Sequence, residues 1–345
     1  MSLKYLLKEL KYYKELDGGL GRVVAKFLLT RTPLKKIVNT PFYNKIYARV
    51  IVKKADKIKP YMLTIEDTSI CNARCLMCPY TSMKRAKKIM TEETFKNVLN
   101  KILKKEKIKY VKFTGLGDPL CDKNLEKKIA YLNKNFDSRV VIFTNGGLLT
   151  KDRTEELLKL NIFKINFSIN GVGEEYRKNM ALDYKKTIAN LEYFLKRKKE
   201  LGKKYPLINI SSLILNEKQK KDFDTFREEW ISKVDSITPC IPSNWSGKVD
   251  EKMAKQAFRG KTWACISLWK ELFVNVDGDV VLCHIDYECD KKFGNLNKES
   301  YETIEKNLNE TKAQHLKGIF TPKACQNCVS SFDTSVDWWG NIGRY

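Results

Sequence analysis

The sequence predicts an α/β fold built on a parallel sheet. Between residues 61 and 239, short β-branched or aromatic runs alternate six times with polar or amphipathic segments. Because parallel strands need crossover helices between them, this alternation predicts a sheet that is either doubly wound or rolled into a whole or partial barrel. From about residue 245 the alternation stops and Cys, Trp, Gly and Asp become denser, which predicts a second, smaller α+β domain. The expected units are residues 1–60, 61–243 and 244–345.

Each expected strand is a run of six to nine residues of high β-propensity. The six strands are expected at 61–67, 109–115, 139–146, 163–171, 207–215 and 234–239. Thr91 is expected to cap the helix after the first strand, and one long helix is expected to run from the fourth strand to about residue 201. In parallel α/β sheets the residues just after the strands form the working face, so functional residues are expected there.

The first sixty residues are basic and helical in pattern. Leu3, Leu6, Leu7 and Leu10 have the spacing of one helix face. We expect this extension to pack on the main domain, although a peripheral contact with an anionic membrane surface is the alternative. The whole chain has 65 Lys and Arg against 41 Asp and Glu, a formal charge of +24. That excess indicates either lysine-covered helix faces or an anionic partner.

The chain is expected to be cytoplasmic. Its first residues interrupt every apolar stretch with Lys or Glu, and no run of about 20 apolar residues occurs, so neither a signal peptide nor a transmembrane segment is expected. Thiols stay reduced in the cytoplasm, where clustered cysteines indicate metal binding more often than disulfides.

The segment CNARCLMCPY (71–80) holds three of the ten cysteines in a C-x3-C-x2-C pattern directly after the first strand. Cys71, Cys75 and Cys78 are therefore expected on a loop at the working face. Three thiolates can hold three irons of a [4Fe–4S] cluster and leave the fourth iron open to another ligand. A structural zinc ion needs four protein ligands, and no histidine lies nearby in the sequence.

Four more cysteines fall in the second domain. A strand, an Asp-Gly turn and a second strand are expected before Cys283. The CQNC segment is a C-x2-C pair, which is typical of chelation of one metal centre. The four candidate ligands are Cys265, Cys283, Cys325 and Cys328. Their spacing is compatible with a zinc ion or with a fully ligated [4Fe–4S] cluster.

With these motifs in this order, the chain resembles the radical S-adenosylmethionine (SAM) superfamily. The resemblance implies a partial (β/α)6 TIM-like barrel, a [4Fe–4S] cluster on Cys71, Cys75 and Cys78, and cleavage of SAM to a 5′-deoxyadenosyl radical that abstracts a substrate hydrogen. The glycine-rich FTGLGDPL (113–120), FTNGG (143–147) and SING (168–171) match the family's segments after the second, third and fourth strands. Residues implied to contact SAM are Met77, Tyr80, Gly115, Gly117, Asp118, Thr144, Asn145, Ser168 and Asn170. Asp118 stands where the family usually has Glu.

The cysteine-rich end resembles the SPASM/Twitch extension of that superfamily. The resemblance implies one auxiliary [4Fe–4S] cluster on the four cysteines of the second domain, and an external one-electron donor such as flavodoxin or ferredoxin. A fully ligated cluster is suited to electron transfer. The expected reaction is therefore a two-electron oxidation (dehydrogenation). The resemblance, together with the positive charge, implies a sugar- or cyclitol-type substrate, with or without a phosphate.

Three alternatives stay open on the sequence. In a sugar or peptide epimerase, Cys121 or Cys240 would donate a hydrogen atom to the substrate radical. In a peptide-modifying maturase, the substrate would be a peptide. From a different class, the basic charge and the C-x2-C pair also fit a zinc-stabilised nucleic-acid-binding protein.

Overall fold

The computed structural model describes residues 58–240, 243, 245–247, 264–326 and 328, together with five residues near the N-terminus, 8, 11, 12, 14 and 15. The leucine face expected for residues 3–10 lies outside the described residues, as do most of the expected N-terminal extension and the last seventeen residues. The five described N-terminal residues are helical.

Nine strands of the described part form one sheet in the order β6-β5-β4-β3-β2-β1-β7-β8-β9. Every pair from β6 to β7 is parallel, whereas β7–β8 and β8–β9 are antiparallel. The predicted α/β class is confirmed, with the sheet of a partial barrel followed by a small antiparallel part. The strands are β1 (Met62–Ile65), β2 (Tyr110–Phe113), β3 (Arg139–Thr144), β4 (Ile162–Ser168), β5 (Leu207–Leu213), β6 (Ser236–Cys240), β7 (Glu271–Val274), β8 (Asp279–Val281) and β9 (Lys292–Asn295).

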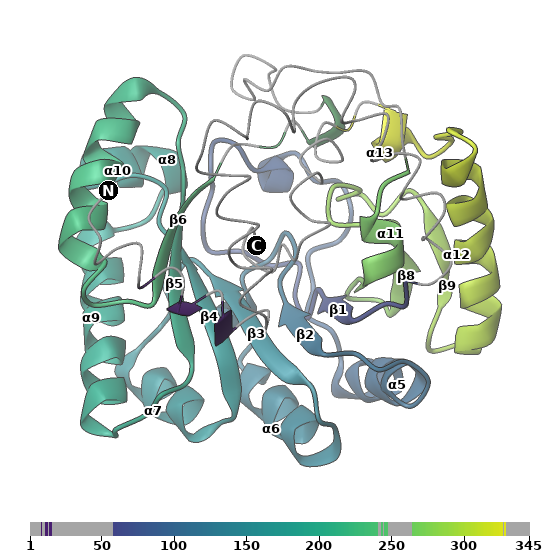
Figure 1. The fold of residues 1–345 in the computed structure, drawn as a ribbon, viewed down its shortest axis with the longest axis horizontal. Helices are drawn as coiled ribbons and strands as arrows, with labels where there is room; N and C mark the ends of the chain where they lie inside the picture. The colour runs from purple at the N-terminus through teal and green to yellow at the C-terminus, as the bar shows by residue number, and fades with distance from the viewer. Residues whose placement is uncertain are drawn as a thin grey trace.

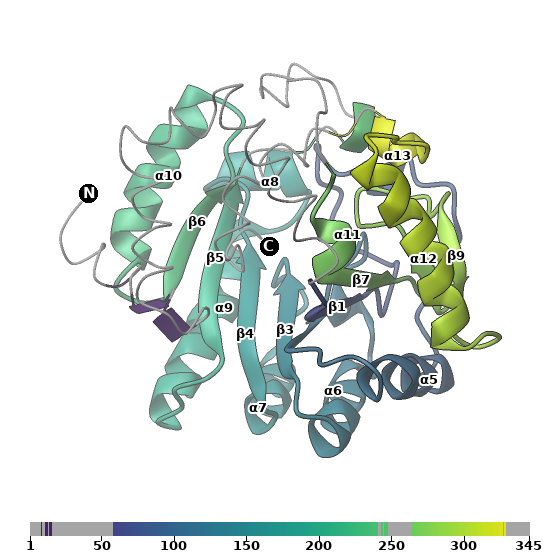
Figure 2. The ribbon, with the colours of Figure 1, turned by 45° about the vertical axis from the view of Figure 1, so that its right-hand side comes forward.

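The crossover helices lie along the outer side of the curved parallel strands (Figures 1 and 2). They are α5 (Glu92–Leu103), α6 (Leu125–Asn135), α7 (Lys151–Lys159), α8 (Glu174–Met180), α9 (Tyr184–Glu200) and α10 (Glu217–Trp230). The C-terminal part adds α11 (Ser267–Lys270), α12 (Tyr301–Leu316) and α13 (Lys323–Gln326), and short 3-10 turns lie at Pro79–Thr81 (η2), Pro119–Cys121 (η3) and Trp245–Gly247 (η4).

The helix after the first strand begins as predicted, because the Thr91 hydroxyl accepts a hydrogen bond from the Thr94 amide at 3.1 Å. The single long helix expected up to residue 201 is wrong: it is two helices, α8 and α9. Ala181 ends α8 in a left-handed conformation (φ 55°), and the Asp183 carboxylate caps α9 by accepting from the Lys186 amide. Asp is among the strongest N-cap residues, so this capping position was readable in the sequence.

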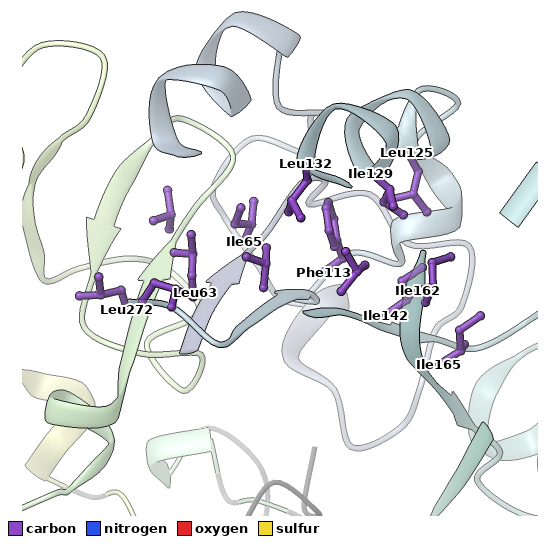
Figure 3. Close-up of a cluster of buried hydrophobic side chains, with 14 of the residues drawn as sticks. Leu63, Ile65, Phe113, Leu125, Ile129, Leu132, Ile142, Ile162, Ile165 and Leu272 are labelled. Atoms are coloured by element: carbon purple, nitrogen blue, oxygen red, sulfur yellow. The ribbon is translucent and has the colours of Figure 1, made fainter. Parts of the chain in front are cut away.

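The two faces of the parallel strands differ in chemistry. Successive strand residues point to opposite faces. Leu63, Ile65, Phe113 and Ile142 belong to the large core under the helices, where they meet Leu125, Ile129 and Leu132 of α6 (Figure 3). The alternate residues of the same strands point to the inside of the barrel, where many are polar.

The amino ends of the strands are closed by an apolar floor. Tyr12, from the N-terminal helical residues, is 3% exposed and packs there with the first inward residues of five strands. The other members of this floor are Met62, Tyr110, Val141, Phe163 and Leu207. At its edge the Glu15 carboxylate accepts hydrogen bonds from Lys204 and Tyr205, both at 2.8 Å. The expectation that the extension packs on the main domain therefore holds for these described residues.

The hairpin expected before Cys283 is present as β7 and β8, with Gly278 at φ +81° in its turn. The sequence did not predict where this hairpin lies. Strand β7 pairs in parallel with β1, from Met62 opposite Glu271 to Ile65 opposite Val274. The cysteine-rich segment is thereby joined to the barrel through one continuous sheet.

Candidate active site

A cavity of about 350 Å³ opens at the carboxyl ends of the parallel strands. Eleven of the twelve residues expected to hold the cluster or contact SAM contribute to its lining, and Tyr80 does not. The eleven are Cys71, Cys75, Met77, Cys78, Gly115, Gly117, Asp118, Thr144, Asn145, Ser168 and Asn170. Cys240, at the end of β6, also lines it.

The loop after β1 carries the three thiols of the first motif. The Cys71 amide donates to the Tyr80 hydroxyl (3.0 Å), which fixes the start of the loop. Because its hydroxyl is engaged in this way, the Tyr80 side chain supports the loop and does not line the cavity. The Ala73 amide donates to Cys71 Sγ at 3.4 Å, and the Cys78 amide donates to the Cys75 carbonyl at 3.1 Å. These contacts hold the three cysteines on a single wall of the cavity.

Burial raises the pKa of all three thiols, that of Cys75 to about 12 and that of Cys78 to about 11. The cysteines are therefore neutral thiols at neutral pH unless a cation displaces their protons. Thiolates are the ligands that iron–sulfur clusters use, and a metal centre deprotonates its thiol ligands. Three soft donors on one cavity wall fit a [4Fe–4S] cluster.

Gly117 brings the glycine-rich segment directly against this loop. A Cβ atom at this position would lie 2.0 Å from the backbone oxygen of Thr68 and 2.8 Å from that of Ile70. The Asp118 amide donates to the Ile70 carbonyl at 2.9 Å, one residue before Cys71. Glycine is thus required here by the close approach of two backbones, and not by a positive φ.

Asp118 is buried and fully engaged by the chain itself. Its carboxylate accepts from the Leu120 amide (2.9 Å), the Asn145 amide (2.6 Å) and the Thr144 hydroxyl (2.9 and 3.0 Å to the two oxygens). Burial raises its pKa, and these donors oppose that increase. The Asp118 side chain connects the loop after β2 to the loop after β3. Asp118 therefore positions these two loops and also lines the cavity.

Asn145 and Asn170 are also held in place by hydrogen bonds. Asn145 Nδ2 donates to Asn72 Oδ1 at 2.8 Å and lies 4.0 Å from Cys71 Sγ. Asn170 Oδ1 accepts from the Leu213 amide at 3.0 Å, which links the end of β4 to β5. The two amides therefore form fixed parts of the rim, and Ser168 lies half-buried beside them on the wall.

The two candidate hydrogen donors differ in position. The Cys121 thiol lies 4.0 Å from Asn72 Oδ1, behind the cluster loop and off the cavity lining. Cys240 lines the cavity, and its thiol lies 3.8 Å from the Thr238 carbonyl. Only Cys240 of this pair is therefore placed to face a bound substrate.

The four cysteines of the second motif converge around Cys283. Burial raises the pKa of the Cys283 thiol, and the nearby thiols of Cys328, Cys325 and Cys265 raise it further. Cys289 is not among these thiols: it is buried near Arg85 and Glu66, with φ +58°. The convergence brings together ligand candidates from three separate segments of the sequence.

The residue after Cys283 reaches the reaction cavity. His284 is a lining residue of the cavity, together with Ile285. Its ring lies 5.9 Å from that of Phe273 and 6.3 Å from that of Trp245, whose indole nitrogen donates to the Met77 carbonyl at 2.8 Å. Cys283, one member of the four-cysteine group, is therefore adjacent in sequence to a residue that lines the cavity.

No three His, Cys, Asp or Glu side chains of the described residues are arranged to hold a single metal ion. A cubane cluster binds each thiolate to a different iron, so its ligands stand farther apart than those of one ion. Across the same residues, no helix is long and apolar enough to cross a membrane.

Two protein families match this arrangement. The model described as the radical SAM superfamily matches residues 65–217, from β1 through the start of α10. The chain belongs to the radical SAM superfamily. It also carries a SPASM domain, described as an iron–sulfur cluster-binding domain, at residues 265–329. A radical SAM core takes SAM and a [4Fe–4S] cluster, and the SPASM domain adds an auxiliary iron–sulfur site.

Curated relatives of this radical SAM chain are distant. The tungsten-containing aldehyde ferredoxin oxidoreductase cofactor-modifying protein of Pyrococcus furiosus is 26% identical over 162 residues, covering 46% of the chain and 45% of the relative. The SAM-dependent 2-deoxy-scyllo-inosamine dehydrogenase of Niallia circulans is 30% identical over 105 residues, covering 30% and 42%. The chain thus spans about half or less of the length of these relatives.

Solved structures share the fold over a larger part of the radical SAM chain. BtrN in complex with AdoMet and 2-DOIA is 19% identical, with a TM-score of 0.54, covering 79% of this chain and 93% of BtrN. Streptococcus suis SuiB bound to the precursor peptide SuiA is 13% identical, with a TM-score of 0.61, covering 93% and 86%. These likenesses extend to the fold alone.

The inward-facing strand residues were missed in the sequence analysis. Lys112, Asn166, Asn209 and Glu271 line the cavity below the SAM-site residues. Their signal was the alternation of polar and apolar residues in strands such as FKINFS, where the outer face is covered by helices. Polar residues on the other face of such a strand have to point into the barrel.

Proposed function

We propose that this enzyme dehydrogenates a sugar- or cyclitol-type substrate in a two-electron oxidation. When bound, SAM and the cluster on Cys71, Cys75 and Cys78 supply a 5′-deoxyadenosyl radical that removes one hydrogen atom from the substrate. Completion of the oxidation requires the loss of a proton and a second electron. The residues that would hold an auxiliary [4Fe–4S] cluster are Cys265, Cys283, Cys325 and Cys328, and that cluster would supply the acceptor for the second electron.

One observation carries the proposal: the four-thiol group adjoins the reaction cavity. Cys283 lies among the other three thiols, while His284, its neighbour in sequence, lines the cavity. A cluster with four cysteine ligands has no vacant iron for substrate, so electron transfer is its expected task. The partial match to the Niallia circulans dehydrogenase supports the same reaction class.

The radical chemistry also needs an external one-electron donor, for which a flavodoxin or ferredoxin is proposed. Leu76 supports an approach near the cluster loop, because it lies between Cys75 and Cys78 and is 54% exposed. The loop amides at 74 and 76 donate to the Met180 and Asn179 carbonyls at the end of helix α8, which also carries two exposed cations, Arg177 and Lys178. We also propose that the enzyme works in the cytoplasm, because a reducing compartment keeps its ten cysteines as free thiols.

An epimerase is the second candidate, and Cys240 is the observation that favours it. A thiol on the cavity wall can give a hydrogen atom to a substrate radical, which leaves the oxidation state of the substrate unchanged. The thiyl radical formed would return to a thiol by taking one electron from the external donor and one proton from solvent. A peptide substrate remains the third candidate, since the fold is shared with SuiB, whose structure contains a precursor peptide. A radical SAM core does not fit the zinc-stabilised nucleic-acid-binding alternative.

The test begins with the metals of anaerobically reconstituted protein. We expect about eight irons per chain, matching sulfide and no zinc, together with 5′-deoxyadenosine after dithionite reduction. Incubation with deuterated cyclitols and sugars should then transfer deuterium into 5′-deoxyadenosine and yield a ketone. About four irons with zinc in the second site would overturn dehydrogenation, because the second electron would have no acceptor.

A further inference from the structure

A belt of polar side chains lines the interior of the barrel below the SAM-site residues. Its members come from β1, β2, β4, β5, β6 and β7 and all line the cavity. They are Thr64, Lys112, Asn166, Asn209, Thr238 and Glu271, which we call the polar belt. Barrel interiors of this kind are usually filled by bulky apolar side chains. A polar belt above an apolar floor therefore needs an explanation other than packing.

The centre of the belt is an ion pair between Lys112 and Glu271. Lys112 Nζ lies 2.5 Å from Glu271 Oε1, and the two side chains are only 8% and 11% exposed. The Thr64 hydroxyl donates to the same carboxylate oxygen. Removing two charges from water is costly, and replacing such a pair with apolar residues is often neutral or stabilising. Stability alone does not account for this pair on a cavity wall.

The other half of the belt is a chain of neutral hydrogen bonds. The Thr238 hydroxyl donates to Asn209 Oδ1 at 3.1 Å, and Asn209 Nδ2 donates to Asn166 Oδ1. Asn166 Nδ2 then donates to the Ser211 hydroxyl at 2.8 Å. Each amide is fixed in orientation by its neighbours, so the belt presents a preorganised polar surface to a ligand.

The belt has balanced charge. Lys112 and Glu271 cancel, and the remaining members are neutral donors and acceptors. Lys164, the next inward residue of β4 below Asn166, is covered by the rings of Tyr12 and Phe143 at 5.4 and 6.0 Å and does not line the cavity. A phosphate entering the belt would meet the Glu271 carboxylate without an excess of positive charge. Hydroxyl groups, which both donate and accept, match this surface.

We propose that the polar belt binds the hydroxyl-bearing ring of an uncharged cyclitol or sugar, with the Lys112–Glu271 pair as its anchor. This inference rests on the proposed function for the substrate class and adds the residues that select it. It also places the phosphate-free end of a phosphorylated substrate against the polar belt.

The test measures binding and turnover separately, with scyllo-inositol and its monophosphate as probes. Calorimetry on the anaerobic, SAM-loaded holoenzyme should detect scyllo-inositol and weaker binding of the monophosphate. The double variant K112M/E271Q should bind scyllo-inositol about 10- to 100-fold more weakly, because hydrogen bonds to charged groups are lost. Its iron content and SAM affinity should match the wild type, which shows that it has folded.

A milder pair of variants keeps the inference testable if the double variant does not fold. Thr238→Val removes one belt hydroxyl at nearly constant volume, and about 2- to 10-fold weaker binding is expected. Its matched control is Thr154→Val, a buried threonine of α7 outside the cavity, for which no change is expected.

Unchanged scyllo-inositol affinity in both belt variants, or tighter binding of the monophosphate than of scyllo-inositol, overturns the inference. The proposed function fails in a different way. Weakened binding in the variants without any ketone from the wild type would support the belt and refute dehydrogenation. Ketone formation with equal KM in wild type and variants would support dehydrogenation and refute the belt.

Discussion

Replacing Asp118 with Asn tests whether this residue positions the SAM site or only contacts SAM. The carboxylate accepts from two backbone amides and one hydroxyl, all within the protein. An asparagine turns one acceptor oxygen into a donor, which then faces the amide of either Leu120 or Asn145. The Thr144 hydroxyl can rotate, but a backbone N–H cannot.

The magnitude follows from the bonds lost. One buried amide without an acceptor costs about 1–3 kcal/mol, and the remaining bonds lose the assistance of the negative charge. We therefore expect Asp118→Asn to lower the free energy of unfolding of the cluster-free protein by about 2–4 kcal/mol. The affinity for SAM should fall as well, because the loops after β2 and β3 are no longer tied together.

Urea unfolding of the cluster-free protein measures the first effect, and equilibrium dialysis of the reconstituted enzyme with labelled SAM measures the second. The control is Asp183→Asn, an exposed helix cap at which Asn is as good as Asp. The positioning argument is refuted if Asp118→Asn unfolds at the same urea concentration as the wild type while SAM binding is lost. That result would make Asp118 a direct ligand of SAM.

Four further predictions concern the cysteine thiols and Gly117. Replacing both Cys325 and Cys328 with Ala should remove about half of the iron, as measured by metal analysis, and should abolish turnover while SAM cleavage persists; loss of SAM cleavage would contradict separate roles for the two sites. Cys240→Ala should leave dehydrogenation within about threefold of the wild type, because only an epimerase needs that thiol; a block in turnover with continued 5′-deoxyadenosine formation would favour epimerisation. Gly117→Ala should abolish SAM cleavage, because the new Cβ overlaps a backbone oxygen at 2.0 Å; retained cleavage and iron content would show that the loop can move. Burial raises the pKa of Cys121 to about 11, so its alkylation by iodoacetamide in the cluster-free protein, followed by mass spectrometry, should rise about tenfold per pH unit between pH 7 and pH 10; a plateau near pH 8 would contradict that pKa.

The six parallel strands were predictable because each is a short β-branched or aromatic run separated by a helical segment, and the cysteine loop was predictable from its spacing together with its place directly after the first strand. The break between α8 and α9 was missed because Ala181 ends α8 in a left-handed conformation. Alanine rarely adopts this conformation, so an alanine in the sequence does not predict the end of a helix. The cap at Asp183 was the available signal.

The anchor pair of the belt was beyond sequence reasoning for a different reason. Lys112 and Glu271 meet because β1, which lies between their strands, pairs with β2 on one side and β7 on the other. In the sequence, Lys112 in KYVKFTG and Glu271 at the start of a hairpin carry no mutual pattern. Tertiary pairing of distant segments decides such contacts, whereas propensity and periodicity report only on neighbours in the chain.

The pairing of β7 with β1 has a consequence for how this enzyme can be divided. Strand β1 leads directly into the cysteine loop, and without β7 it would become an open sheet edge with unpaired backbone groups. A truncated barrel ending near residue 243 would expose that edge and would be prone to edge-to-edge aggregation. The cysteine-rich segment thus covers the edge of the barrel in addition to its proposed role as an electron acceptor, and we expect the two metal sites to form only when both parts of the sheet are present.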